Sequence, residues 1–283
     1  MLAGQSVARV GFGAMQLPGP GVWGPPRDRD AALAVLRRAV ELGVNHIDTA
    51  QYYGPDVANE LIRAALHPYP DDLVLVSKVG GVRTASGGWT AAQRPEQLRS
   101  GVEDNLRSLA VDCLGVVNLR LIGNDERVDL DSQLAEMVAL REEGKIGGVG
   151  VSNVTADQLR RALASGIACV QNPYNVLDRS GEPVLELCRQ YDVAWVPFFP
   201  LGSAGIPGVP KVTEHPAVTS TAASLGVTPA QVGLAWLLAH DAHTLLIPGT
   251  SSLDHLEENV ATTDVHLDAE MMTTLDRLAA PTG

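Results

Sequence analysis

The chain has 283 residues, of which 45% are hydrophobic and 19% charged, and its formal net charge at pH 7 is −12. This length is normal for a single α/β barrel with a large core. The acidic balance and the lack of a long basic run argue against nucleic acid and anionic membrane surfaces as partners.

No apolar run reaches about 18 residues, and the first ten residues contain no apolar segment of signal-peptide length. We therefore expect no membrane span. The three cysteines, Cys113, Cys169 and Cys188, are widely spaced and form no C-x-x-C motif. This pattern predicts reduced thiols in the core and a cytoplasmic protein.

Short apolar runs alternate with amphipathic segments along the whole chain. The predicted strands cover residues 8–13, 44–48, 73–78, 113–120, 146–151, 168–171, 193–198 and 244–248. The predicted helices cover residues 28–42, 57–66, 95–109, 130–143, 155–164, 183–191, 217–225, 229–240, 253–260 and 269–278. Eight strand–helix units in about 250 residues predict a single-domain (β/α)8 TIM barrel over residues 1–283.

The alternative architecture is a doubly wound sheet, which carries a glycine-rich phosphate turn directly after its first strand. A literal G-x-G-x-x-G does occur at residues 19–24, but it follows no predicted strand and contains Pro20. We interpret this segment as a turn-rich loop and not as a dinucleotide motif.

Polar residues gather at one end of the predicted barrel. The loops after the carboxyl ends of the strands build the active site of such a fold. The residues at these ends can pair, donate, accept or stack: Asp48, Lys78, Arg120, Ser152 with Asn153, Gln171, Phe198 and Gly249. Their convergence on one face predicts a catalytic site.

Asp48, Tyr53 and Lys78 could form a proton-donating group within that site. A free phenol has a pKa near ~10, and a neighbouring ammonium lowers it by favouring the phenolate. A carboxylate beside the lysine would keep that ammonium charged and in place. The alternative is a structural ion pair between Asp48 and Lys78, with Tyr53 as an aromatic at the rim.

Other kinds of site have weaker support in the sequence. His240 and His243 lie three residues apart without an H-E-x-x-H motif, so we expect a helix-end or loop role and no metal centre. There is no G-x-S-x-G nucleophile motif. Trp23 and Trp89 lie in predicted glycine-rich loops, where they could line a substrate entrance or pack at the rim.

The sequence resembles the aldo-keto reductases over essentially its whole length. Seven ordered motifs carry the resemblance: GFGAMQL at 11–17, HIDTAQYYG at 46–54, LVLVSKVG at 73–80, GVSN at 150–153, VQNPYN at 170–175, PFFPLG at 197–202, and IPGTSS at 247–252 with EEN at 257–259. Within that superfamily, residues 13–30 and 116–123 look most like the bacterial pyridoxal reductases.

The resemblance implies an NADPH-dependent reductase that converts a small aldehyde to an alcohol, with pyridoxal as the expected substrate. Tyr53 would be the general acid, Lys78 the cation that favours its phenolate, and Asp48 the partner of Lys78. Reductases of other small carbonyl compounds share these features. A weakly catalytic NADPH-binding redox sensor is the alternative from another functional class.

The resemblance also implies how NADPH would bind. Ser152, Asn153 and Gln171 would hold the nicotinamide carboxamide, and Phe198 would stack on the ring. The residues expected along the pyrophosphate and around the adenosine end are Leu201, Ser203, Ser251, Ser252, Glu258 and Asn259. The helix start near Leu253 suits a phosphate because it carries partial positive charge.

Three positions depart from the pattern of the family. Arg120 stands where most members have a catalytic histidine; an arginine cannot shuttle a proton, but it can donate to a carbonyl oxygen or anchor a ring substituent. It could instead form a buried ion pair with a carboxylate of the site. Gly249 and His255 occupy the places of two common 2′-phosphate ligands, and Phe198 replaces a frequent tyrosine.

Overall fold

The computed structural model describes residues 1–123, 128–202 and 209–279. Its strands are β1 Phe12–Gly13, β2 His46–Asp48, β3 Val74–Arg83, β4 Trp89–Ala92, β5 Leu114–Arg120, β6 Ile146–Ser152, β7 Ile167–Gln171 and β8 Ala194–Trp195. Its α-helices are α1 Arg29–Glu41, α2 Val57–Leu66, α3 Pro95–Leu109, α4 Leu130–Glu142, α5 Ala156–Ala162, α6 Glu182–Tyr191, α7 Pro216–Leu225, α8 Pro229–His240, α9 Leu253–Val260 and α10 Ala269–Asp276. Four short 3-10 helices cover Ala14–Gln16, Leu163–Ser165, Val212–Glu214 and Ala261–Asp264.

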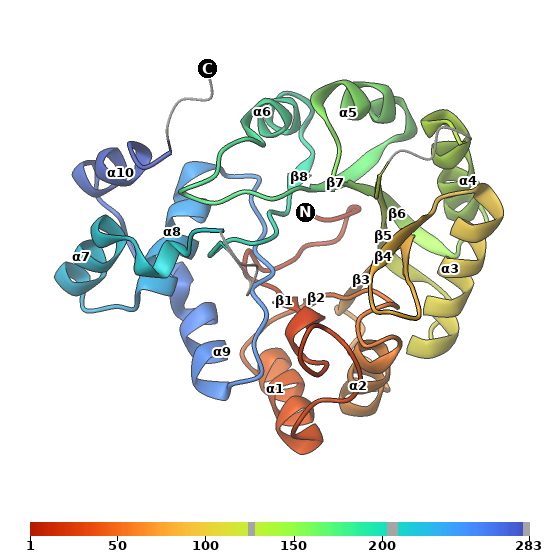
Figure 1. The fold of residues 1–283 in the computed structure, drawn as a ribbon, viewed down its shortest axis with the longest axis horizontal. Coiled ribbons are helices and arrows are strands. Elements are labelled where there is room, and N and C mark those ends of the chain that lie inside the picture. The colour runs from red at the N-terminus through yellow and green to blue at the C-terminus, as the bar shows by residue number, and fades with distance from the viewer. Residues whose placement is uncertain (124–127, 203–208, 280–283) are drawn as a thin grey trace.

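Parallel strands form the centre of the molecule, in the order β1-β2-β3-β5-β6-β7-β8. Residues 244–246 complete the ring, since Thr244 forms a parallel bridge with Trp195 and Leu246 one with Val10. Figure 1 shows the helices arranged around these strands. Neighbours in the sheet are neighbours in the chain, and this order confirms the predicted (β/α)8 barrel over the doubly wound sheet.

Several helices begin at residues whose side chains cap them. These side chains accept hydrogen bonds from the free backbone N–H groups of the first turn. Thr155 and Thr228 each accept from the backbone N–H three residues later, in reciprocal capping boxes with Gln158 and Gln231. Asp28, Asp129, Ser252 and Asp268 cap four further helices in the same way without the return bond.

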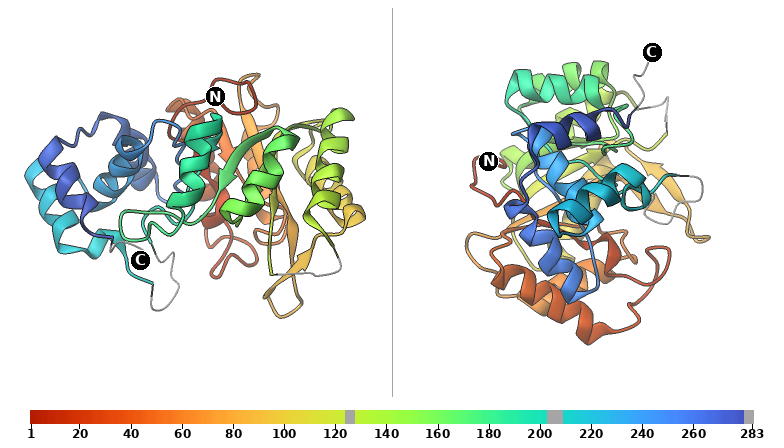
Figure 2. Two further views of the ribbon diagram at one scale, coloured as in Figure 1. Left: turned by 90° about the horizontal axis from the view of Figure 1, so that it is seen from above. Right: turned by 90° about the vertical axis from the view of Figure 1, so that its left-hand side faces the viewer.

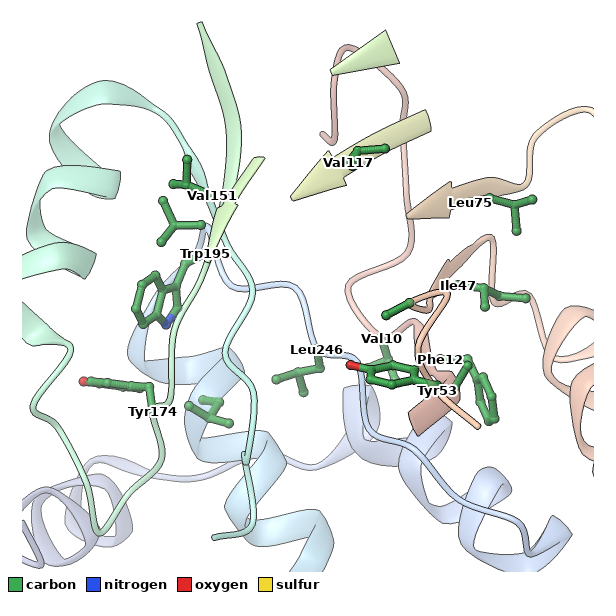
Figure 3. Packing of buried hydrophobic residues seen from close by; sticks show 14 of the residues in the cluster. Val10, Phe12, Ile47, Tyr53, Leu75, Val117, Val151, Tyr174, Trp195 and Leu246 are labelled. Carbon is green, nitrogen blue, oxygen red and sulfur yellow. The ribbon is translucent and has the colours of Figure 1, made fainter. Parts of the chain in front are cut away.

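The hydrophobic core has two layers, which follow from the period of two along each strand. Inward-facing side chains fill the barrel interior: Val74, Val76, Val116, Cys169, Ala194, Val196 and Leu245, with Leu2 from the N-terminal segment. Outward-facing residues such as Leu75 and Val117 pack beneath the helices in the second layer, part of which Figure 3 shows. The next inward positions after Val76 and Val116 are Lys78 and Asn118, so the interior turns polar toward one end.

Helices α7, α8 and α10 extend the molecule on one side of the barrel, and Figure 2 shows α7 and α10 together at that end. Trp236 links α8 to α10 within this region, because its Nε1 donates to Asp276 at 3.0 Å. Within the described chain no single helix is long and apolar enough to cross a membrane, although α7 and α8, bent by 94°, meet the length and composition criteria as a pair.

The structure corrects three expectations. The third strand continues to Arg83 and pairs with β4 in an antiparallel hairpin, so Trp89 lies on a strand and not in a loop. The predicted eighth strand is present only as isolated bridges. Cys169 and Cys188 are buried as expected, but Cys113, which directly precedes β5, is exposed.

Candidate active site

A cavity of about 700 Å³ opens where the strands end. Its described lining includes eleven of the predicted site residues: Asp48, Tyr53, Lys78, Arg120, Ser152, Asn153, Gln171, Phe198, Leu201, Gly249 and Asn259. Ser251, Ser252 and Glu258 are not among the lining residues. Ser203 lies outside the residues that the structure describes.

Strand register brings these residues together. Lys78 lies opposite Asn118, Arg120 opposite Ser152, and Ser152 opposite Gln171 in adjacent parallel strands. Because the strands run in the same direction, their last inward-facing side chains reach the same end of the barrel. Residues up to 123 positions apart therefore meet, as the contact between Asp48 and Gln171 shows.

Asp48, Lys78 and Tyr53 form the floor of the cavity and are all buried. Lys78 Nζ pairs with Asp48 Oδ1, donates to the Thr49 carbonyl at 3.0 Å, and lies 5.2 Å from the centre of the Tyr53 ring. Burial disfavours the ammonium, but attraction to Asp48 and Tyr53 and the hydrogen bond to Asp48 together outweigh it, so the pKa of Lys78 is raised. This direction favours the charged ammonium beside the phenol.

Gln171 extends this arrangement. Its Nε2 donates to Asp48 Oδ2 at 2.7 Å, so each carboxylate oxygen of Asp48 has a partner. A carboxylate only accepts, which fixes the orientation of the amide. The Gln171 carbonyl oxygen is buried and has no partner within the described structure. It is a hydrogen-bond acceptor available to a molecule in the cavity.

A second polar group lies behind the floor, between the barrel and helices α2 and α3. Thr49 Oγ1 donates to Asn59 at 2.9 Å, and Asn59 Nδ2 donates to Asn105 at 3.0 Å and to Ser108 at 2.9 Å. Ser77 Oγ donates to Asn105 at 2.6 Å, and Asn105 Nδ2 donates to the carbonyl oxygen of the preceding turn at 2.8 Å. Thr49 and Ser77 adjoin Asp48 and Lys78 in sequence, so this outer polar network fixes the strand ends that carry the ion pair.

Arg120 and Trp89 line one side of the cavity, and Arg83 and Trp23 pack next to them. The Arg120 guanidinium lies 4.3 Å from the Trp89 ring, and Arg83 lies 4.6 Å from Trp89 and 5.5 Å from Trp23. Arg83 also donates to the carbonyl oxygens of Gly21, Val22 and Gly87 at 2.7–2.9 Å. It therefore joins the 19–24 loop to the β3–β4 hairpin.

The described residues give Arg120 little hydrogen bonding. One bond, from Nη2 to the Gly81 carbonyl, measures 3.4 Å, and the buried Nε atom has no partner. Burial lowers the pKa of Arg120, with Tyr53 and Asp48 opposing that effect. Among the described residues, Arg120 forms no ion pair with a carboxylate of the site, which was the alternative predicted for it.

The opposite side is built from close backbone approaches. A Cβ on Gly13 would meet the Ile247 carbonyl oxygen at 2.3 Å, and one on Gly249 would meet the Gly13 carbonyl at 2.4 Å. Gly13 N–H donates to the Pro248 carbonyl at 3.2 Å. Only glycine lets these two segments pass so closely beside the cavity. Asn153, on the facing wall, adopts the left-handed conformation that asparagine tolerates.

The sequence analysis missed several lining residues, including Met15, Gln16, Ile122, Phe199, Lys211 and Thr213. Gln16 and Met15 lie in a 3-10 helix that follows β1, and Lys211 lies in a loop. Neither segment has a periodic pattern that marks it. Phe199 adjoins Phe198, and the two rings meet edge to face at 5.1 Å.

Of the residues expected near an adenosine end, Ser251 and Ser252 lie at the start of α9, and Glu258 and Asn259 lie in its last turn. Ser252 caps this helix by accepting from His255 N–H at 3.4 Å, and Ser251 and His255 are exposed. Among the described residues, no three His, Cys, Asp or Glu side chains are placed to hold a metal ion. His240 instead stacks on Trp236 with ring centres 4.5 Å apart.

Comparison with known proteins identifies the class that this barrel and cavity define. The model of the aldo/keto reductase family matches residues 9–280, so the chain belongs to that family and is an oxidoreductase. It is 46% identical to pyridoxine 4-dehydrogenase of Escherichia coli (strain K12), over 98% of this chain and 97% of that protein.

Solved structures agree with the family assignment. A thermostable aldo-keto reductase in complex with the inhibitor epalrestat is 30% identical, with a TM-score of 0.83 and 98% of each chain covered. An aldo/keto reductase from Klebsiella pneumoniae, in complex with NADP and acetate, is also 30% identical, with a TM-score of 0.79 over 96% of this chain and 91% of that one.

Proposed function

We propose that the protein reduces small aldehydes to alcohols with NADPH, and that pyridoxal, which would become pyridoxine, is its substrate. The observation that carries the proposal is the buried Asp48–Lys78 pair beside the Tyr53 phenol at the floor of the cavity. The similarity to pyridoxine 4-dehydrogenase supports the substrate, and the NADP complex of the Klebsiella pneumoniae relative supports the cofactor.

The cavity fits a nicotinamide nucleotide. The unpartnered Gln171 oxygen can accept from a carboxamide N–H, with Ser152 and Asn153 beside it. Phe198 offers an aromatic face to the ring, while Leu201, Gly249 and Asn259 line the rest of the groove. Ser203, Ser251, Ser252 and Glu258 remain proposed contacts of the pyrophosphate and adenosine parts. When bound, the nicotinamide would supply hydride to the carbonyl carbon.

The side chains at the floor of the cavity would carry out the proton transfer. Tyr53 would donate its hydroxyl hydrogen to the carbonyl oxygen as the alcohol forms, and the Lys78 ammonium would stabilise the remaining phenolate. Asp48 keeps Lys78 charged and oriented, and through Gln171 it links the proton donor to the carboxamide pocket. Arg120 would donate to the substrate from the wall.

A substrate and cofactor panel tests this proposal. The purified protein is mixed with NADPH or NADH and with pyridoxal, simple aromatic aldehydes or sugar-derived aldehydes, and loss of the reduced cofactor is followed by absorbance. We expect the highest kcat/KM with NADPH and pyridoxal. Higher values with another aldehyde would reassign the substrate. Cofactor binding without oxidation by any aldehyde would favour the redox-sensor alternative.

A further inference from the structure

The cavity is more positive than the protein that contains it. The chain carries a net charge of −12, yet the charged residues that line the described cavity are Asp48, Lys78, Arg120 and Lys211. Asp48 is paired with Lys78, and Lys211 is paired with Glu214 at 2.6 Å in an exposed position. Among the residues that the structure describes, Arg120 is thus the lining cation that these pairs leave uncompensated.

Arg120 is also held in a defined orientation. Trp89 packs against its guanidinium at 4.3 Å, and the bond to the Gly81 carbonyl restrains one edge. Arg120, Tyr53 and Asp48 all line the cavity, so the guanidinium and the proton donor face the same space. A planar guanidinium fixed by an aromatic ring can offer two parallel N–H groups to a pair of oxygen atoms.

This geometry favours a particular class of aldehyde. A ring with an ionised hydroxyl group ortho to its aldehyde presents two oxygens side by side, one anionic and one the reacting carbonyl. A guanidinium fork can donate to both at once, whereas a single imidazole can donate to only one. The anionic oxygen would also neutralise the charge of the partly buried guanidinium, which a neutral substituent would not do.

We propose that Arg120 is a specificity-determining residue that selects aromatic aldehydes carrying an ionised oxygen ortho to the carbonyl. The inference rests on the proposed aldehyde reductase function and narrows it, since pyridoxal has its hydroxyl at that position. It assigns Arg120 to substrate choice, while proton donation remains with Tyr53. The enzyme would then recognise the ortho oxygen and not the distant substituents of the ring.

A matched pair of substrates isolates this feature. 3-Hydroxypyridine-4-carbaldehyde and pyridine-4-carbaldehyde differ by the ortho hydroxyl alone. We expect the wild-type protein to prefer the hydroxylated compound by about 10- to 100-fold in kcat/KM, which is the range for one charge-assisted hydrogen bond. Equal kcat/KM values for the two compounds would overturn the inference and leave the reductase function standing.

Variants then identify the group responsible. Arg120→His keeps one donor and loses the fork, and Arg120→Met loses both, so the preference should fall to within about threefold in each. Arg160→Met is the matched control, because it removes an exposed guanidinium of α5 that does not line the cavity, and it should retain the preference. A preference that survives in both Arg120 variants would contradict the assignment.

A binding measurement separates the two proposals if turnover is absent. Quenching of tryptophan fluorescence by each pyridine aldehyde gives a Kd in the presence of NADP⁺, where reduction does not occur. Tighter binding of the hydroxylated compound to the wild type, lost in Arg120→Met, would uphold the inference even if the reductase function failed. Equal Kd values for the two compounds would overturn it.

Discussion

Two buried polar groups lie a few residues apart in this barrel, and they differ in how completely their atoms are paired. In the outer polar network, Asn59 and Asn105 each make several hydrogen bonds to neighbouring side chains and backbone. In the cavity, the Gln171 carbonyl oxygen and Arg120 Nε have no partner among the described residues. Unpaired buried polar atoms are costly, so they mark the place where a ligand supplies the missing bonds.

The comparison separates residues that hold the fold from residues that act on a ligand. Breaking the outer network should affect stability first and activity only through it. Changing the unpaired groups of the cavity should affect activity, with little effect on stability. Variants of the two groups test that separation.

Tyr53→Phe should lower kcat by about 10²- to 10⁴-fold, the range for losing a general acid, while the protein still binds NADPH. Thermal unfolding should remain close to wild type, since the phenyl ring keeps its packing in the core. Tyr52→Phe is the control, because Tyr52 adjoins Tyr53 but does not line the cavity, and it should keep its turnover. Wild-type kcat in Tyr53→Phe would refute the acid assignment.

Lys78→Met should lower both stability and activity, because Lys78 belongs to the cavity floor and to a buried ion pair. The uncompensated Asp48 charge should lower the free energy of unfolding by about 3–5 kcal/mol, and kcat should fall with a changed pH–rate profile. The double variant Asp48→Asn, Lys78→Met should recover much of the stability and none of the activity. An unchanged pH–rate profile in Lys78→Met would count against phenolate stabilisation.

The raised pKa of Lys78 also predicts the direction in which folding stability changes with pH. A group whose folded pKa exceeds its unfolded value of about 10.4 stabilises the fold fully below that pH. This stabilisation is lost as pH rises through the folded pKa. Denaturant titrations at increasing alkaline pH should therefore show a stability loss in the wild type that is absent from the double variant.

Asn105→Ala should lower the free energy of unfolding by about 2–4 kcal/mol, since Asn59 and Ser77 lose a buried partner. Arg120→Met should change the free energy of unfolding by less than about 1 kcal/mol, because a partly buried cation with few hydrogen bonds contributes little to the fold. Urea denaturation of both variants makes the comparison directly. Equal losses of stability would erase the distinction between the two polar groups.

A third polar group, far from the cavity, extends the comparison. Glu182 pairs with His240 and Tyr174 between α6 and α8, and the hydrogen bond with His240 is the main reason that its pKa is lowered to about 2. A lowered folded pKa means that the stabilisation is present above about 4.3 and lost as pH falls through about 2. Glu182→Gln should therefore be less stable than wild type at pH 7, and the difference should shrink in acid. A difference independent of pH would contradict this account.

The sequence predicted the regular elements well, since periodic apolar stripes and capping residues mark helices directly. Thr155 with Gln158 is one such signal, and the helix begins there. The β3–β4 hairpin was missed because its glycines, from Gly80 to Gly88, suggested an irregular loop. Cys113 was expected in the core because its residue type is usually buried, although the strand begins only one residue later.

For the site, the sequence predicted which residues lie near the cavity but not how they pair. Strand ends identify which residues approach the cavity, because parallel strands share a direction. Pairing between them depends on register and rotamers, so the bond from Gln171 to Asp48 across 123 residues had no signal in the sequence. The same holds for the stacking of Arg120 on Trp89, which required the hairpin to be known.

Arg83 links two segments of the chain beside the cavity, the 19–24 loop and the β3–β4 hairpin. Its guanidinium donates to carbonyl oxygens in the 19–24 loop and in the hairpin turn at Gly87, segments about 60 residues apart in the chain. A chimera that receives either segment from a relative without the other would lose this shared anchor. Directed changes of substrate range should therefore exchange the two segments together.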